Sequence, residues 1–220
     1  MARTALIAGA TGLIGGELVA QLSGSSAYER VVAWVRRVPE NSANVEFQIV
    51  DFERLSEAPA LAPTDAFCAL GTTLERAGSQ SAFRRVDHDY VIGFAEAAAR
   101  RGADRLIVVS ALGADPESRV FYNRVKGETE RDVTALGLPS LYLVRPSLLL
   151  GSRSEFRIGE RIAALSMKPL SALMRGSLRR YRPIRAHDVA RAMVSLAARG
   201  EPGCHAVESD ELARLARQDE

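Results

Sequence analysis

TALIAGATGLIGG, residues 4–16, joins a short apolar run to the start of a helical pattern through a turn rich in glycine. The run predicts a strand over residues 4–9, and the pattern predicts a helix over about residues 13–22. Gly9, Gly12 and Gly15 would let the backbone approach a pyrophosphate, which the free N–H groups at the helix start would bind. A strand, a glycine turn and a helix in this order indicate a dinucleotide site, with an idle structural turn as the alternative.

Outward from this unit, apolar runs of strand length alternate with segments of helix length. Residues 31–35, 45–50, 66–70, 105–110 and 141–145 predict strands, and residues 79–101, 119–135 and 187–198 predict helices. Nearly continuous runs of Val, Ile and Leu are typical of strands buried on both faces of a parallel sheet. We therefore predict an α/β fold with a doubly wound parallel sheet (a Rossmann fold), as a single domain over residues 1–220. The rhythm weakens at about residues 151–185, which we interpret as a small C-terminal substrate-side flap.

Composition excludes several classes of function. The net charge of +2 is too small to predict a nucleic-acid or membrane partner. No signal segment opens the sequence and no apolar run reaches about 18 residues, so we expect a cytoplasmic protein. Cys68 and Cys204 form no metal-like spacing, and we expect both to be small buried hydrophobes. The histidines are isolated, so no metal site is predicted.

Two arginines follow the second predicted strand, about 20 residues after the glycine turn. Sites that prefer NAD(H) usually carry an acidic residue there for the ribose hydroxyls, whereas NADP(H) sites carry arginine for the 2′-phosphate. This chain has Arg36 and Arg37 and no acid at that point. The pair predicts NADP(H) as the preferred cofactor over NAD(H), the alternative being a solvated basic surface pair.

A tyrosine and a lysine lie four positions apart in a predicted helix. Tyr122 and Lys126 therefore share one helix face. A tyrosine serves as a proton donor near neutral pH when its pKa of about 10 is lowered, which an ammonium nearby does. Ser110 ends a predicted strand, where it could bind a substrate carbonyl oxygen. We predict Ser110, Tyr122 and Lys126 as catalytic residues, against a chance surface pair.

These motifs together resemble the short-chain dehydrogenase/reductase superfamily, in its atypical, extended-like branch. The glycine turn, Ser110 and the Tyr122 to Lys126 pair stand in the family's order and spacing. More narrowly, ALGTT at 69–73, VVSALGA at 108–114 and YNRVKGE at 122–128 are similar to oxidoreductases related to the human HIV-1 Tat-interactive protein.

The resemblance implies hydride transfer between the nicotinamide of NADP(H) and a small carbonyl or alcohol substrate. Tyr122 would exchange the proton, Ser110 would hold the substrate oxygen, and Lys126 would also hold the nicotinamide ribose. A homodimer is common among such relatives, but the residues here do not decide it. The residues that would line the cofactor are Gly9, Thr11, Gly12, Leu13, Ile14, Gly15, Arg36, Arg37, Asp51, Phe52, Leu70, Gly71, Thr72, Tyr122, Lys126, Pro146 and Leu148.

Two departures keep other functions open. Asp87 stands where many relatives place an asparagine that helps to relay protons, so the relay is altered or absent. The chain is also shorter than the extended-branch epimerases and dehydratases, which disfavours a large nucleotide-sugar substrate. The alternatives are a non-catalytic NADP(H)-binding redox sensor or scaffold, and an enzyme that retains its cofactor. The basic stretch Arg175, Arg179, Arg180, Arg182 and Arg185 is interpreted as a solvated face, with an acidic-substrate pocket or a partner-docking surface as alternatives.

Overall fold

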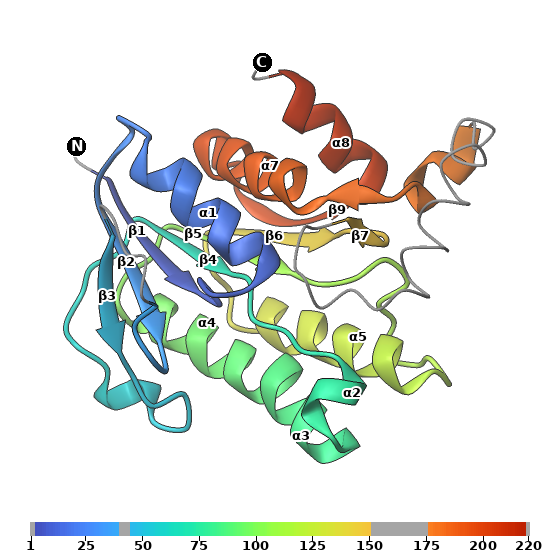
Figure 1. The fold of residues 1–220 in the computed structure, drawn as a ribbon, viewed down its shortest axis with the longest axis horizontal. Coiled ribbons are helices and arrows are strands. Elements are labelled where there is room, and N and C mark those ends of the chain that lie inside the picture. Colours follow the sequence, from blue (N-terminus) through green and yellow to red (C-terminus); the bar gives the residue numbers. More distant parts are fainter. Residues whose placement is uncertain (1–2, 40–44, 151–175, 219–220) are drawn as a thin grey trace.

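The computed structural model describes residues 3–39, 45–150 and 176–218, and its centre is a parallel β-sheet (Figure 1). Seven strands pair in the order β3-β2-β1-β4-β5-β6-β9, and every pairing is parallel. The strands are β1 (Arg3–Ala8), β2 (Tyr28–Val35), β3 (Glu46–Ile49), β4 (Asp65–Cys68), β5 (Arg105–Val109), β6 (Ser140–Arg145) and β9 (Gly203–Glu208). This confirms the predicted doubly wound sheet.

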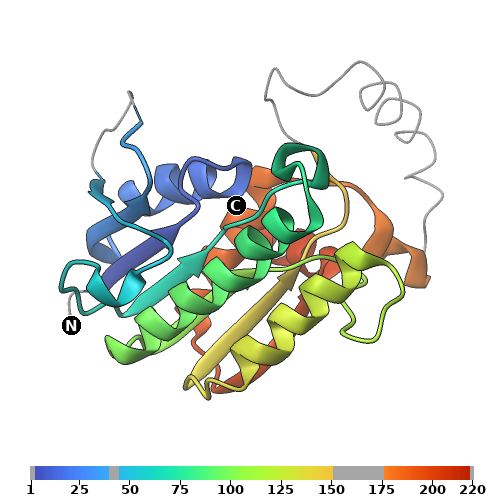
Figure 2. The ribbon, with the colours of Figure 1, turned by 90° about the horizontal axis from the view of Figure 1, so that it is seen from below.

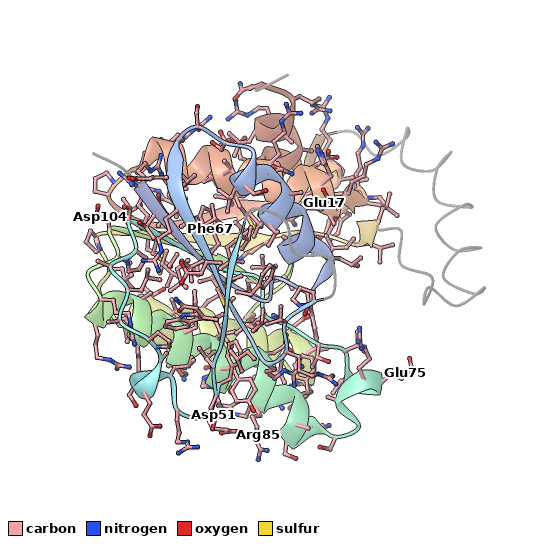
Figure 3. All side chains as sticks on the ribbon, turned by 60° about the vertical axis from the view of Figure 1, so that its left-hand side comes forward. Glu17, Asp51, Phe67, Glu75, Arg85 and Asp104 are labelled. Atoms are coloured by element: carbon pink, nitrogen blue, oxygen red, sulfur yellow. The ribbon has the colours of Figure 1, made fainter. Side chains whose placement is uncertain are left out.

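Helices cover both faces of the sheet (Figures 1 and 2). On one face lie α1 (Leu13–Ser23), α7 (Ala186–Arg199) and α8 (Ser209–Gln218), and on the other lie α4 (Tyr90–Arg100) and α5 (Phe121–Thr134). Because the inner strands are buried on both sides, the sheet separates two apolar cores. Phe67 belongs to the α1 and α7 core and lies near the middle of the molecule (Figure 3), whereas Trp34 belongs to the core on the α4 face.

The helix predicted over residues 79–101 is divided in the structure. It consists of α3 (Gln80–Arg84), a π-helical turn η2 (Arg85–Asp89) and α4. Ser79 caps α3 by accepting a hydrogen bond from the Ala82 N–H at 3.1 Å. A π-turn inserts an extra residue, which hydrophobic periodicity does not reveal, and such turns are frequent at functional sites. Here the turn buries Asp87.

Shorter elements complete the described chain. They are η1 (Leu55–Glu57), α2 (Leu74–Ala77), η3 (Gly176–Tyr181) and a small parallel pair formed by β7 (Leu149–Leu150) and β8 (Ile184–Arg185). Most of the predicted flap, residues 151–175, lies outside the described residues, so the flap stays a prediction.

One expectation about the cysteines is wrong. Cys68 is buried as predicted, but Cys204 is exposed. The reason is that Cys204 belongs to β9, the edge strand, whose first residues lie outside the cores. Sequence alone does not distinguish an edge strand from an inner strand when both carry small residues.

The strand order reverses between β1 and β4, which lie beside each other at the centre of the sheet. Ligands of open α/β sheets bind outside the carboxyl ends of the strands at such a reversal. The glycine turn follows β1 there, and residues 69–73 follow β4. The fold therefore places both predicted cofactor segments beside each other at the carboxyl edge of the sheet.

Candidate cofactor and active site

The glycine turn is built so that no side chain fits at two of its positions. Gly9 has a φ of +84°, and a Cβ added there would lie 2.4 Å from the Ala69 carbonyl oxygen. A Cβ at Gly15 would lie 2.0 Å from the Gly9 carbonyl oxygen. The Gly12 N–H donates to that same oxygen at 2.8 Å. Gly9 thus lies tightly against the segment that follows β4, and Gly12 and Gly15 close the turn upon Gly9, which leaves the backbone open to a close approach by a phosphate.

The start of α1 is suited to an anion. Gly12 is the N-cap residue and makes no side-chain cap hydrogen bond. The first turn also contains no acidic residue. The unpaired N–H groups and the positive end of the helix dipole are therefore available to a bound negative charge. Thr11, Leu13 and Ile14 lie at this helix start, and their predicted contact with the cofactor stays a prediction.

Arg36 and Arg37 follow β2 at the predicted position, and both are exposed. Within residues 3–39, 45–150 and 176–218, neither arginine takes part in an ion pair, so both guanidinium groups are free to meet an external anion. The positive charges of Arg36 and Arg85 both act on Tyr90, although burial has the largest effect and raises the pKa of this tyrosine. Arg36 and Arg85 therefore both lie near the Tyr90 ring.

Asp51 and Arg85 lie on the same side of the molecule (Figure 3), and Phe52 follows Asp51 in the chain. Asp51 accepts hydrogen bonds from the Glu53 N–H at 2.9 Å and from Arg54 Nε at 3.1 Å, which hold the pKa of its carboxyl group below the ordinary value. Phe52 is buried against Tyr90 at 5.7 Å between ring centroids. The predicted cofactor contact of both residues stays a prediction.

Asp87 connects the cofactor-side turn to the predicted catalytic lysine. Its Oδ1 lies 2.7 Å from Lys126 Nζ, and its Oδ2 accepts the Thr72 N–H at 2.8 Å. Only 6% of the Lys126 side chain and 1% of the Asp87 side chain are exposed. Gly71 lies against the same carboxylate, since a Cβ there would be 3.4 Å from Asp87 Oδ1.

The charge of Lys126 depends on two opposing effects. Burial lowers the pKa of Lys126, but Asp87, and after it Tyr122, act in the opposite direction and together raise the pKa above its ordinary value. Lys126 is therefore a cation at neutral pH. Tyr122 and Lys126 lie four positions apart within α5, so they lie on one face of that helix.

Ser110 follows β5 and is buried, with 6% of its surface exposed. Its Oγ has no hydrogen-bond partner among the described residues, although its N–H donates to the Val144 carbonyl oxygen at 2.7 Å. A buried hydroxyl without a partner is uncommon, because it carries the full cost of desolvation. Its partner is therefore expected to be a bound molecule.

Tyr122 lies in the first turn of α5, and its ring packs against Phe83 of α3 at 5.6 Å between centroids.

Gly127 sets the packing of α5 against the loop after β5, a role that was not predicted from the sequence. A Cβ at Gly127 would lie 2.1 Å from the Pro116 nitrogen, so this helix admits the loop after β5 at backbone distance. The signal was present as a glycine inside a predicted helix, where it costs about 1 kcal/mol relative to alanine.

The loops after β5 and β6 are joined by the Leu112 N–H, which donates to the Pro146 carbonyl oxygen at 3.0 Å. Pro146 is thereby placed beside the segment of Ser110, whereas Leu148 is 48% exposed.

The basic stretch contacts β9 at one point, because Arg180 pairs with Glu208 at 3.5 Å. Arg175 lies outside the described residues.

Among the described residues no cluster of metal-ligating side chains occurs, and none of the helices is long and apolar enough to cross a membrane.

Comparison with known proteins agrees with this geometry. The model of the family described as NAD(P)H-binding matches residues 9–199, which include the glycine turn, Asp87, Ser110 and Lys126. The chain belongs to this NAD(P)H-binding family. The match fixes the class of cofactor but not the choice between NADPH and NADH.

Relatives of this NAD(P)H-binding protein extend over most of the chain. "Protein FMP52, mitochondrial" of Eremothecium gossypii is 34% identical over 222 residues, covering 98% of both chains. "Protein HTATIP2" of Rattus norvegicus is 40% identical over 167 residues, covering 73% of this chain and 69% of that protein. The second relative confirms the resemblance to the oxidoreductases related to the Tat-interactive protein.

Solved structures confirm the fold. MoeE5, in complex with UDP-glucose and NAD, matches with a TM-score of 0.69 at 19% identity, over 98% of this chain and 81% of MoeE5. A UDP-N-acetylglucosamine 4-epimerase from Bacillus cereus matches with a TM-score of 0.70 at 14% identity, over 98% and 82% of the two chains. At these identities the likeness concerns the Rossmann-type fold, which the short-chain dehydrogenase/reductase resemblance predicted.

The expectation of a cytoplasmic protein is wrong. The FMP52 relatives from Eremothecium gossypii, Candida albicans and Saccharomyces cerevisiae are all named mitochondrial. The expectation rested on the lack of a signal segment and of a long apolar run. Neither feature distinguishes the cytoplasm from the interior of an organelle, so the inference had no physical basis for that choice.

Proposed function

We propose that this protein is an NADP(H)-dependent oxidoreductase of the short-chain dehydrogenase/reductase type. It would transfer a hydride between the nicotinamide and a small carbonyl or alcohol substrate. The observation that carries the proposal is the buried Ser110 Oγ, which lacks a partner among the described residues at the carboxyl edge of the sheet. An idle structural serine in this position would find a protein partner or face water.

The described residues fit a dinucleotide. The glycine turn leaves no room for a side chain at Gly9 or Gly15, and the start of α1 would offer N–H groups to a pyrophosphate. When bound, the nicotinamide supplies or accepts the hydride. Thr72 and Leu70 follow β4 at the same crevice and would line the cofactor.

The protein's own residues would position the substrate and move the proton. Ser110 would donate its hydroxyl hydrogen to the substrate oxygen, which supplies the partner that it lacks. Tyr122 would give a proton to that oxygen in reduction, or take one in oxidation. Lys126, held as a cation, would stabilise the phenolate that remains and bind the nicotinamide ribose.

Arg36 and Arg37 support NADP(H) rather than NAD(H). Both guanidinium groups are exposed and free of ion pairs in the described part of the chain, and no acidic residue follows β2 at this point. A guanidinium binds phosphate oxygens in a bidentate manner, whereas ribose hydroxyls call for a carboxylate.

A second function is favoured by one observation. The ion pair between Lys126 and Asp87 occupies the ammonium that a catalytic lysine would direct at the ribose and the tyrosine. A redox sensor or scaffold that binds NADP(H) without turnover would tolerate this arrangement. The retention of Ser110, Tyr122 and Lys126 together favours the enzyme.

The two functions are separated by a substrate screen. Purified protein with NADPH is tested against a panel of small aldehydes and ketones, and NADPH oxidation is followed by absorbance, with the Tyr122→Phe variant as the matched control. Oxidation that depends on both the carbonyl compound and Tyr122 supports the enzyme. NADPH binding without oxidation across the panel favours the sensor or scaffold.

A further inference from the structure

The proposed function assigns no role to the buried carboxylate of Asp87. Its carboxylate is buried and accepts two donors, the ammonium of Lys126 at 2.7 Å and the N–H of Thr72 at 2.8 Å. One donor belongs to the predicted catalytic pair and the other to the turn beside the cofactor crevice. A single side chain therefore joins the two halves of the candidate site.

The backbone that carries Asp87 is fixed to α5 by further contacts. Thr129 Oγ1 donates to the Asp87 main-chain oxygen at 3.0 Å. The neighbouring His88 places Nε2 2.9 Å from Asp132 Oδ2 on α5 and Nδ1 2.8 Å from Asp89 Oδ1. The π-turn η2 is thus attached to α5 through Asp87 and its neighbour, which aims the carboxylate at Lys126.

The other groups around the ammonium do not replace this carboxylate. Tyr122 on α5 and Cys68 on β4 also face Lys126, and each raises the pKa of Lys126 by less than Asp87 does. Burial raises the pKa of the Cys68 thiol to about 12, so this group is neutral at physiological pH. Asp87 supplies the nearby negative charge, without which burial would favour the neutral amine.

We infer that Asp87 is a positioning residue, the fixed counter-ion that keeps buried Lys126 charged and anchors the turn at Thr72 to it. This inference rests on the proposed function, because Lys126 is given its role there. Asp87 replaces a proton relay at this point with a static ion pair. Cofactor binding at the turn and the protonation of Lys126 are therefore coupled through one carboxylate.

Asparagine is the sharpest substitution. The new side chain in Asp87→Asn would have the same size but a single acceptor oxygen, and its NH₂ group would face another donor. The variant therefore loses the charge and one of the two hydrogen bonds. Asp89→Asn is the matched control, because it removes one carboxylate from the same π-turn at a side chain that is 57% exposed.

The chain allows a direct measurement, because Lys126 and Lys168 are its only lysines. In protein with isotope-labelled lysine, Lys168→Arg leaves one lysine side-chain signal in the NMR spectrum, that of Lys126. On this background the chemical shift is followed against pH for the parent, Asp87→Asn and Asp89→Asn. We expect Lys126 to titrate at least about one pH unit lower in Asp87→Asn and to be unchanged in Asp89→Asn.

Equal titration of the parent and Asp87→Asn would overturn the inference. If Asp87→Asn does not fold, the titration of Lys126 in the parent protein tests the inference instead. A Lys126 pKa at or below the ordinary lysine range would overturn the inference, and a pKa above that range would support it. NADPH affinity is measured in parallel, and Asp87→Asn is expected to weaken it about fivefold or more through the loss of the Thr72 anchor. Failure of the parent to bind NADPH would remove the proposed function, while the lysine titration would still decide the ion pair.

Discussion

Two buried aspartates stand at opposite ends of the sheet, Asp65 at the start of β4 and Asp87 beyond the carboxyl end of that strand. Asp65 has none of its side chain exposed and meets two guanidinium groups, with Arg3 Nη2 at 2.6 Å and Arg105 Nη1 at 3.0 Å. Arg3 also donates to Tyr28 Oη at 3.1 Å. Each acceptor in this network has a protein donor, and the network joins β1, β2, β4 and β5.

At the opposite edge one buried polar group lacks a protein partner. Asp87 meets one ammonium and one backbone N–H, and the buried Ser110 Oγ has no partner in the described chain. Burial of a carboxylate therefore does not by itself mark a functional site. We propose that the saturated Asp65 cluster at the amino edge serves the fold, and that the unpaired Ser110 Oγ at the carboxyl edge serves a bound ligand.

The largest expected effect belongs to the carboxyl edge. Tyr122→Phe removes the proposed proton donor but keeps the ring that packs on Phe83. We expect turnover to fall by about 10²- to 10⁴-fold, and NADPH affinity to stay within about twofold. Steady-state kinetics with an active carbonyl substrate and calorimetry with NADPH measure the two quantities. Unchanged turnover would remove Tyr122 from the mechanism.

The amino edge should respond in the opposite manner. Asp65→Asn leaves Arg3 and Arg105 without their counter-charge, and we expect the free energy of unfolding to drop by about 3–5 kcal/mol with no change in NADPH affinity. Glu46→Gln is the control, because its pair with Arg30 is nearly half exposed and should contribute about 0–1 kcal/mol. Denaturant titration measures both. If Asp65→Asn lost NADPH affinity without losing stability, Asp65 would belong to the cofactor site and not to the framework of the fold.

A smaller effect is expected at the adenosine end of the crevice. Replacing Arg36 and Arg37 by alanine removes charge-assisted hydrogen bonds to a 2′-phosphate, which contribute about 1.5–3 kcal/mol. The preference for NADPH over NADH should fall by about 10- to 150-fold, with NADH affinity retained. Arg214→Ala on α8 is a control for the loss of an exposed arginine elsewhere on the surface. An equal loss of affinity for NADPH and NADH would mean that Arg36 and Arg37 do not bind the 2′-phosphate.

The smallest effect concerns alkaline pH. Burial raises the pKa of the Cys68 thiol from 9.0 to about 12, so the unfolded chain loses this proton at lower pH than the folded protein. The free energy of unfolding should therefore be unaffected below about pH 8, and should fall by up to about 1.4 kcal/mol per pH unit above about pH 9. Denaturant titrations of the parent and Cys68→Ala across this range measure the slope. Equal slopes would show that the thiol does not contribute.

The sheet and the cofactor turn were predictable because their signals are local. The run before Gly9 and the spacing of Gly9, Gly12 and Gly15 indicate a strand, a turn and a helix without reference to the rest of the chain. The pairing of Tyr122 with Lys126 also follows from helix periodicity.

The contacts of Asp87 could not be predicted in this way. They depend on the π-turn, which rotates the residues after Arg85 relative to α3, and on the approach of α5. Nothing in the sequence near Asp87 identifies Thr72 or Lys126 as its partners. The exposure of Cys204 likewise depends on which strand lies at the sheet edge, and strand order is a property of the whole fold.

Binding of NADP(H) at the carboxyl edge of the sheet is the proposal on which the others depend. Calorimetry of the purified protein with NADPH and with NADH, after removal of any cofactor carried through purification, tests it most directly. We predict one site per chain, with NADPH bound about 10- to 150-fold more tightly than NADH. Equal affinities would contradict the role of Arg36 and Arg37, and the absence of binding by either cofactor would contradict the proposed site itself.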